Sequence, residues 1–162
     1  MASARPVDLE AIPMATHERF MRLAIEQARQ NPAFPFGAVI VRVSDQQVLA
    51  AAANRSVENP ALHGEMAAIH DYVGRNGPRG WEDTLLYTTG EPCPMCMGAI
   101  IWAGIGGVVF ATSIERLKAT GFDQIDIAAP VVAAAATFWS GEILGGVLAE
   151  ETDRMFAERP RG

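Results

Sequence analysis

The sequence predicts an α/β fold in a single domain. Segments with helical periodicity and segments with strand-like composition alternate along most of the chain. The 162 residues are 49% hydrophobic and 20% charged, which is enough for one sizeable core and too little for two. We therefore expect one domain over 1–162, with 1–13 forming a flexible N-terminal extension.

The first half of the chain predicts a helix, a strand pair and a second helix. Residues 17–29 carry apolar side chains at helical spacing, and an Asn-Pro pair follows them. Residues 36–53 predict two strands joined by a turn at 44–45, and the first of these strands is apolar enough to lie inside a sheet. A helix over 62–73 completes this half.

The second half continues the alternation. In order, it predicts a strand over 84–89, a short helix from Pro94, a strand over 107–112 and a helix over 114–120. Segment 128–146 fits a helix, a strand or both, whereas 148–158 predicts a closing amphipathic helix with acids in its first turn. This order favours parallel neighbouring strands joined by right-handed crossovers, with helices on the faces of the sheet.

Charge and composition restrict which classes of partner and which cellular location we expect. The formal net charge of -6 argues against strong binding to a polyanion, which disfavours a nucleic-acid partner. The first dozen residues lack the apolar segment of a secretory signal, and we expect a cytoplasmic protein. Residues 92–114 are uncharged over a length that could span a bilayer, but prolines and glycines divide them into a helical piece and a strand-like piece. We therefore expect no membrane partner.

Two short motifs carry the candidate chemistry. His63 and Glu65 flank a glycine, and Cys93 and Cys96 lie in the segment P-C-P-M-C. Together they supply one imidazole, two thiolates and one free carboxylate. This set matches a catalytic zinc site, which has three protein ligands, an open fourth position and a nearby base. The alternative for the cysteines is a purely structural role as a pair of buried apolar thiols.

The local sequence explains how these side chains could converge. Pro94 can occupy the first position of a helix, so Cys96 falls in its first turn and both sulfurs lie near the positive end of the helix. His63 and Glu65 are two residues apart and would diverge in mid-helix. At a helix start, with Gly64 between them, both can face one metal ion.

The pattern H-x-E followed by P-C-x-x-C resembles the signature of the cytidine deaminase superfamily. Further matches to its guanine, cytosine and tRNA-adenosine deaminase branch are PFGAVIV (35–41), Asn54, LYTTGEPCPMCMGAI (86–100) and GVLAEE (146–151). The resemblance implies a three-layer α/β/α sandwich with a central mixed five-stranded sheet. It also implies one Zn²⁺ per chain, a small nucleobase or nucleoside substrate, and a homodimer or larger homo-oligomer.

The segment ATGFDQ (119–124) resembles the GFD element of guanine deaminases and favours conversion of guanine to xanthine and ammonia. Gly64 and Gly90 depart from the alanine and cysteine common in that group, and two such small residues would enlarge the pocket. Guanosine, cytosine, an aminated triazine and tRNA adenosine therefore stay open as alternatives. A noncatalytic zinc-binding module is a further alternative, disfavoured by the presence of Glu65 and the lack of a fourth ligand.

The resemblance also assigns roles to individual residues. His63, Cys93 and Cys96 would bind the zinc, and Glu65 would move protons between water, ring and departing amine. The substrate contacts that it implies are Asn54, Phe36, the backbone near Gly37 and Ala38, and Asp123. Read without the resemblance, Asn54 fits a turn residue and Asp123 an ordinary loop acid. Trp139 receives no role.

Overall fold

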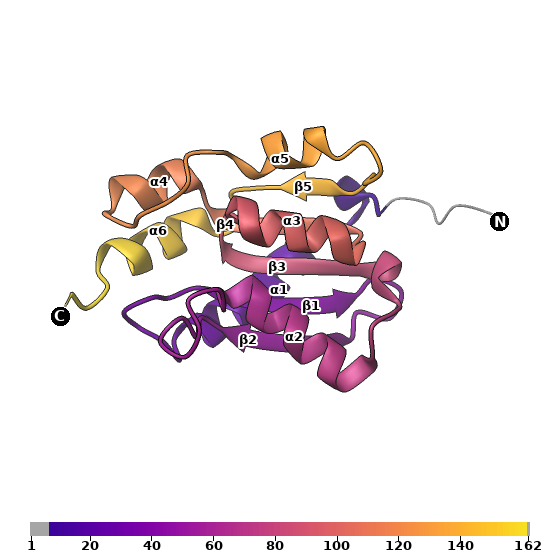
Figure 1. Cartoon of the computed structure of the whole chain (residues 1–162), viewed down its shortest axis with the longest axis horizontal. Helices are drawn as coiled ribbons and strands as arrows, with labels where there is room; N and C mark the ends of the chain where they lie inside the picture. The colour runs from indigo at the N-terminus through magenta and orange to yellow at the C-terminus, as the bar shows by residue number, and fades with distance from the viewer. Residues whose placement is uncertain (1–6, 162) are drawn as a thin grey trace.

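A five-stranded mixed sheet forms the middle layer of the structure (Figure 1). The structure is a computed structural model and describes residues 7–161. In chain order the strands are β1 (Gly37–Arg42), β2 (Val48–Ala53), β3 (Thr84–Gly90), β4 (Gly107–Thr112) and β5 (Glu142–Leu144). Their order in the sheet is β2-β1-β3-β4-β5; β1 runs antiparallel to β2 and β3, whereas β3, β4 and β5 run parallel. The predicted mixed five-stranded sheet is confirmed.

Helices cover both faces of this sheet. On one face lie α1 (Met14–Ala28) and α6 (Ala149–Ala157), and on the other lie α2 (Gly64–Asn76), α3 (Pro94–Ala103) and α5 (Ala129–Ala135) (Figure 1). The short α4 (Ile114–Ala119) packs beside α6, and short 3-10 turns occupy Leu9–Ala11 and Trp81–Asp83. The α/β/α sandwich implied by the family resemblance is therefore present.

The central strands are apolar on both sides because both sides are covered. In β1, Ala38 and Ile40 belong to the core cluster under α2 and α3, whereas Val39 and Val41 belong to the cluster under α1. Every residue of β3 and β4 is buried. Continuous apolar runs of this kind are expected for strands in the middle of a sandwich, because alternate side chains enter opposite layers.

The tail of the chain, where the sequence left a helix, a strand or both open, contains both α5 and β5. The expectation of parallel neighbours holds for β3, β4 and β5 but not for β1 and β3, which are antiparallel. The hairpin inserts β1 between β2 and β3, and this reverses the pairing. Trp139, which had no predicted role, is structural: its indole Nε1 donates to the carbonyl of Ile105 at 2.8 Å.

Residues 7–13 depart from the flexible extension expected for 1–13, whose first six residues lie outside the described part of the chain. Val7 and Leu9 are buried in the cluster under α1, and the carboxylate of Asp8 accepts hydrogen bonds from the next turn. The buried His17 completes this anchor, with Nε2 2.9 Å from the carbonyl of Leu9 and Nδ1 2.9 Å from the hydroxyl of Tyr87. Because the acids Asp8 and Glu10 alternate with Val7 and Leu9, the sequence did not indicate that these two apolar side chains are buried.

Within residues 7–161, no helix combines the length and the apolar character that a bilayer crossing requires. The uncharged run 92–114 divides as predicted into α3 and β4, with a turn at Gly104 between them. Gly104 adopts a left-handed conformation with a φ of 84°, which glycine takes without strain.

Candidate metal centre and active site

Two helices begin at the same place at one edge of the sheet. His63 is the residue immediately before α2, and Cys93 is the residue immediately before α3. Neither side chain forms a capping hydrogen bond to its own helix, so both are available to a ligand. Pro94 occupies the first turn of α3 together with Cys96, as the sequence predicts. The positive ends of both helices therefore face the cluster.

The three predicted metal ligands lie together. His63 Nδ1 is 3.5 Å from Cys93 Sγ and 3.6 Å from Cys96 Sγ. All three ligand atoms lie within 4.8 Å of one another, and no fourth His, Cys, Asp or Glu of residues 7–161 joins the group. Tetrahedral zinc with bonds of about 2.0–2.1 Å to nitrogen and about 2.3 Å to sulfur places those atoms about 3.5 Å apart. The donor set and its spacing therefore fit zinc with one coordination position left over.

Proton affinities in this cluster are coupled. A hydrogen bond from the Cys96 thiol, assisted by His63, lowers the pKa of Cys93 to about 4. The hydrogen bond to Cys93 and then burial raise the pKa of Cys96, and the hydrogen bond to Cys93 raises the pKa of His63. One thiolate is thus favoured even without a metal, while binding at the other two ligands must release protons.

Glu65 lies in the first turn of α2 and is 3% exposed. Its Oε1 accepts a hydrogen bond of 2.7 Å from the hydroxyl of Thr88, which the sequence reasoning did not single out. Burial raises the pKa of Glu65, although the Thr88 hydrogen bond opposes that effect. A carboxyl group with a raised pKa can both accept and return a proton near neutral pH. The only sequence signal for Thr88 was its place at the end of a buried strand.

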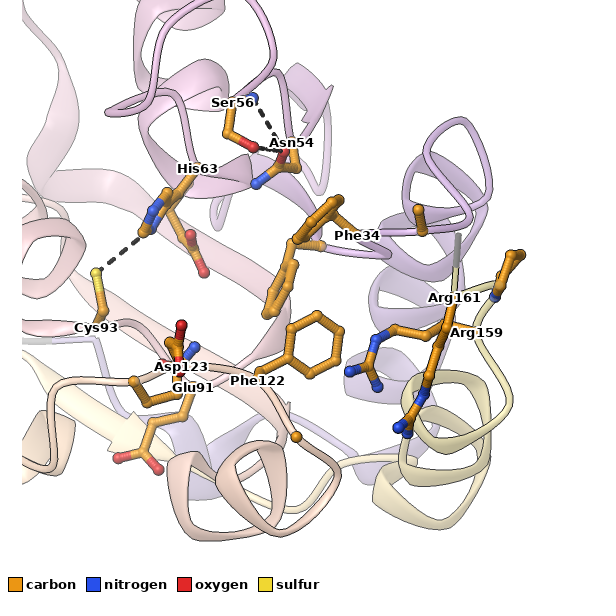
Figure 2. A pocket seen from close by; sticks show the side chains of 16 residues that line it. Phe34, Asn54, Ser56, His63, Glu91, Cys93, Phe122, Asp123, Arg159 and Arg161 are labelled. Atoms are coloured by element: carbon orange, nitrogen blue, oxygen red, sulfur yellow. Dashed lines mark hydrogen bonds between the residues drawn. The ribbon is translucent and has the colours of Figure 1, made fainter.

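A cavity of about 760 Å³ opens beside the metal cluster. Figure 2 shows His63 and Cys93 facing each other at one end of it, and Arg159 and Arg161 at the other, with aromatic rings between them. The predicted site residues that line the cavity are Phe36, Asn54, His63, Glu65, Cys93 and Asp123. Cys96 is fully buried and does not line the cavity, although its Sγ lies 3.6 Å from Nδ1 of His63.

Asn54 presents its amide nitrogen to the cavity. Its Oδ1 accepts hydrogen bonds from the backbone N–H of Ser56 at 3.0 Å and from the Ser56 hydroxyl at 2.7 Å (Figure 2). Among residues 7–161, no protein acceptor takes a hydrogen bond from Asn54 Nδ2. Asn54 therefore offers a hydrogen-bond donor to whatever occupies the cavity.

The expectation that Gly64 and Gly90 enlarge the pocket is wrong. A Cβ at Gly90 would lie 3.0 Å from the ring of Phe36, and a Cβ at Gly64 would lie 2.8 Å from the Phe36 carbonyl oxygen. The space that the two glycines leave is filled by Phe36 itself. Gly90 accommodates the ring of Phe36 and Gly64 accommodates its backbone, so neither glycine leaves open space beside the pocket.

The backbone near Gly37 and Ala38 does not line the cavity. Gly37 lies against α1, where an added Cβ would be 2.2 Å from the carbonyl oxygen of Ala24. Its N–H donates to the Thr89 hydroxyl at 3.1 Å, and Ala38 is completely buried in the core. At this position the glycine serves helix-to-strand packing, which the motif alone could not distinguish from pocket lining.

Residues 14–112 match the family model of the cytidine and deoxycytidylate deaminase zinc-binding region. The chain belongs to this family. The match includes β1 to β4 and all four residues of the two motifs. The protein is thus a zinc-binding deaminase with the cytidine deaminase-like fold, as the sequence pattern indicated.

Three known proteins show which members of the family this deaminase is similar to. The guanine deaminase of Bacillus subtilis is 37% identical over 114 residues, covering 67% of this chain and 72% of the relative. The tRNA-specific adenosine deaminase of the same organism is 35% identical over 102 residues, covering 60% of this chain and 62% of the relative. A crystal structure of a mutant NE0047 protein in complex with 8-azaguanine is 25% identical, with a TM-score of 0.79 and coverage of 90% of this chain and 86% of that one.

A second buried acid beside the site of the deaminase, Glu91, was missed by the sequence reasoning. Glu91 is 7% exposed; its Oε1 accepts from the N–H of Ile114 at 2.9 Å and its Oε2 from the N–H of Ala129 at 2.7 Å. These N–H groups begin α4 and α5, and the segment between them contains the exposed Asp123 (Figure 2). Glu91 thus connects the strand that leads to Cys93 with the opposite cavity wall.

The C-terminal tail of the deaminase supplies the remaining wall, which the sequence reasoning also missed. Arg159 lies 3.6 Å above the ring centre of Phe122 and donates to the carbonyl of Thr120 at 3.0 Å. Phe122 in turn packs edge-on against Phe36 with ring centres 5.2 Å apart. The basic end of the sequence was visible, but nothing in it indicated that the tail folds back to the site.

Proposed function

We propose that this deaminase converts guanine and water to xanthine and ammonia. The observation that carries the proposal is one aromatic-walled cavity with Glu65 and the metal ligands at one end and the hydrogen-bonding groups of Asn54 and Asp123 beside them. Support also comes from the similarity to the guanine deaminase of Bacillus subtilis and to a structure that contains 8-azaguanine, a close analogue of guanine.

Zinc held by His63, Cys93 and Cys96 would act as a Lewis acid that makes the attacking water more acidic. Glu65 would accept the proton that water loses as its oxygen bonds to the ring carbon bearing the amine. It would pass this proton to the adjacent ring nitrogen, and would deliver the second one to the amine as the carbon–nitrogen bond breaks. The balance is guanine plus water giving xanthine plus ammonia, with Glu65 returned to its starting state.

The purine would be oriented by complementary groups. The amide nitrogen of Asn54 would donate to a ring acceptor, while the carboxylate of Asp123 would accept from a ring N–H. Phe36, which lines the cavity, would pack against the purine ring.

We also propose a cytoplasmic homodimer that acts in purine catabolism. An exposed apolar patch supports self-association: Trp102 is 80% exposed, Phe138 is 65% exposed, and their rings lie 5.1 Å apart on the α3 and α5 side. Paired exposed aromatic side chains of this kind are typical of interfaces. Sedimentation equilibrium of the purified protein measures the assembly directly, and a monomer at micromolar concentration would exclude the dimer.

The second candidate is deamination of adenosine in tRNA. It is favoured by the 35% identity to the tRNA-specific adenosine deaminase of Bacillus subtilis. The net charge of -6 opposes it, because affinity for RNA depends on cationic contacts to phosphates. Incubating the protein with unmodified tRNA and measuring inosine tests this alternative.

Ammonia release from a panel of guanine, guanosine, adenine, cytosine and aminated triazines tests the substrate. We expect guanine to be turned over fastest among the unphosphorylated compounds, with xanthine as the product. A zinc-loaded protein that ignores guanine and releases ammonia from another ring would overturn the proposal.

The first predicted variant is Glu65→Ala. Loss of a positioned acid–base group is expected to lower kcat by about 10²- to 10⁴-fold, while zinc remains stoichiometric because Glu65 is not a ligand. Glu150→Ala is the matched control, since Glu150 is also a first-turn helix acid but is exposed and does not line the cavity. Retained turnover in zinc-replete Glu65→Ala would remove Glu65 from the mechanism.

A further inference from the structure

The end of the cavity far from the metal contains two arginines that converge. Arg159 Nη1 and Arg161 Nη2 each donate to the carbonyl oxygen of Thr120 at 3.0 Å. Both guanidinium groups lie within 3.8 Å of the position that a Cβ would take at Gly121. Burial and the charge of Arg161 both lower the pKa of Arg159. Two like charges are therefore held close together in a protein whose net charge is negative.

The charge of these two arginines is not neutralised by any carboxylate in the described part of the chain. Among residues 7–161, no carboxylate forms an ion pair with Arg159 or Arg161, although six other ion pairs are present. Each guanidinium group has five N–H donors, and the carbonyls of Thr120 and Phe156 use only a few of them. Most of the donors of the pair are thus free to bind an anion.

Charge is distributed unevenly along the cavity. Glu91 and Asp123 lie toward the metal end, and the two arginines form the opposite end (Figure 2). Glu65 also belongs to the metal end, where its side chain interacts with Cys96. The acceptors at the metal end suit the N–H groups of a purine, while planar guanidinium groups suit a phosphate. The cavity volume of about 760 Å³ is also in the upper part of the roughly 300–1,000 Å³ range of sites for drug-sized ligands, well above the size of a single base.

We propose that Arg159 and Arg161 form a phosphate subsite, so that the enzyme deaminates a purine nucleoside monophosphate in preference to the unphosphorylated nucleoside. The inference rests on the proposed purine deamination and extends its substrate class. The phosphate is bound and released unchanged; the only bonds altered are those of the deamination at the ring.

The decisive comparison uses guanosine and guanosine 5′-monophosphate, which differ only in the phosphate. We expect kcat/KM for the monophosphate to exceed that for guanosine by about ten- to a hundredfold, as charge-assisted hydrogen bonds would provide. Inorganic phosphate is expected to inhibit turnover of the monophosphate competitively. An equal kcat/KM for the two compounds, or a lower one for the monophosphate, overturns the subsite.

Arg161→Gln is the informative variant because Arg161 is exposed and makes a single hydrogen bond to the other described residues. It is expected to lower the ratio of the two kcat/KM values at least about tenfold. Arg154→Gln, which removes an exposed arginine of α6 outside the cavity, should leave the ratio unchanged. An equal fall for both substrates in Arg161→Gln would indicate a structural role and contradict the proposal.

Arg159 also packs on Phe122, so Arg159→Lys provides the second measurement. This substitution keeps the positive charge but removes the planar guanidinium group and its paired N–H donors. It should therefore weaken binding of the monophosphate more than binding of guanosine in isothermal titration calorimetry. Inorganic phosphate titrated alone separates a free-anion site from a substrate subsite: phosphate binding without preference for the monophosphate would overturn the proposal. Normal guanine turnover in that case would leave the proposed function standing, whereas absence of turnover on every purine would remove the function itself.

Discussion

The two ends of the cavity are built differently. At the metal end, His63 and Cys93 immediately precede two helices that pack on one face of the sheet, and Glu65 and Cys96 lie in the first turns of those helices. The opposite end comes from an irregular segment around Phe122 and from the C-terminal tail. The chemistry thus resides on rigid secondary structure, while the groups that would select the substrate lie on loops, which can change without disturbing the metal site.

The largest effect is expected from breaking the metal end. Cys96→Ala removes a fully buried ligand from a set of three, so zinc occupancy should fall to a small fraction of one per chain. We expect kcat to fall by more than about 10⁴-fold, because Glu65 then has no acidified water to deprotonate. The melting temperature should also fall, since metal binding is coupled to folding.

Met95→Ala is the matched control for Cys96→Ala. Met95 occupies the same turn of α3 but is 38% exposed and is not a ligand. Zinc content measured by elemental analysis, with activity on the same samples, checks both variants. Full zinc occupancy in Cys96→Ala would mean that the metal is held by other residues and that the two ends of the cavity are not separated as described.

A smaller effect is expected from substitution of Asn54, a cavity-lining residue that would contact the substrate. Asn54→Asp keeps the oxygen that accepts from Ser56 and replaces the amide donor with an acceptor. Loss of one buried hydrogen bond to the purine should lower kcat/KM about 10- to 100-fold, mostly through KM, with zinc unchanged. Ser56→Ala, which removes only the hydroxyl that orients the amide, should cost less. An unchanged KM in Asn54→Asp would mean that Asn54 is only a turn residue and does not contact the substrate.

The difference between the two ends also explains what the sequence could predict. His63, Glu65, Cys93 and Cys96 lie in two short segments whose geometry is set by local features, such as Pro94 at a helix start. Local rules therefore sufficed for the metal end and for most helices and strands. The two errors at Gly64 and Gly90 arose because Phe36, whose backbone lies against Gly64 and whose ring lies against Gly90, is distant in sequence.

The wall made by Phe122 and Arg159 depends entirely on long-range contacts. These residues meet because α4 and α6 pack together, and no periodicity or motif specifies where a tail after the last helix will lie. The antiparallel pairing of β1 with β3 was missed for the same reason, since it depends on where the hairpin inserts. Contacts between distant segments were thus the part of the site that sequence patterns did not reveal.

The smallest expected effect concerns Glu91, the residue that connects the two ends. Glu91→Gln replaces one of two accepting oxygens with an amide group that faces a backbone N–H, of Ile114 or of Ala129. The expected loss of about 1–3 kcal/mol corresponds to a fall in melting temperature of about 2–4 °C per kcal/mol. Glu115→Gln, an exposed acid in the first turn of α4, is the control.

If Glu91 acts by positioning the segment that contains Asp123, Glu91→Gln should raise KM by about tenfold or less and leave kcat and zinc content nearly unchanged. Asp123→Asn should then remove most of this sensitivity, because residues that act through the same contact have non-additive effects. Additive losses in the double variant, or a lower kcat with an unchanged KM, would indicate that Glu91 acts on the metal end instead. The cycle therefore tests whether the two ends of the cavity are independent or are coupled through this one buried carboxylate.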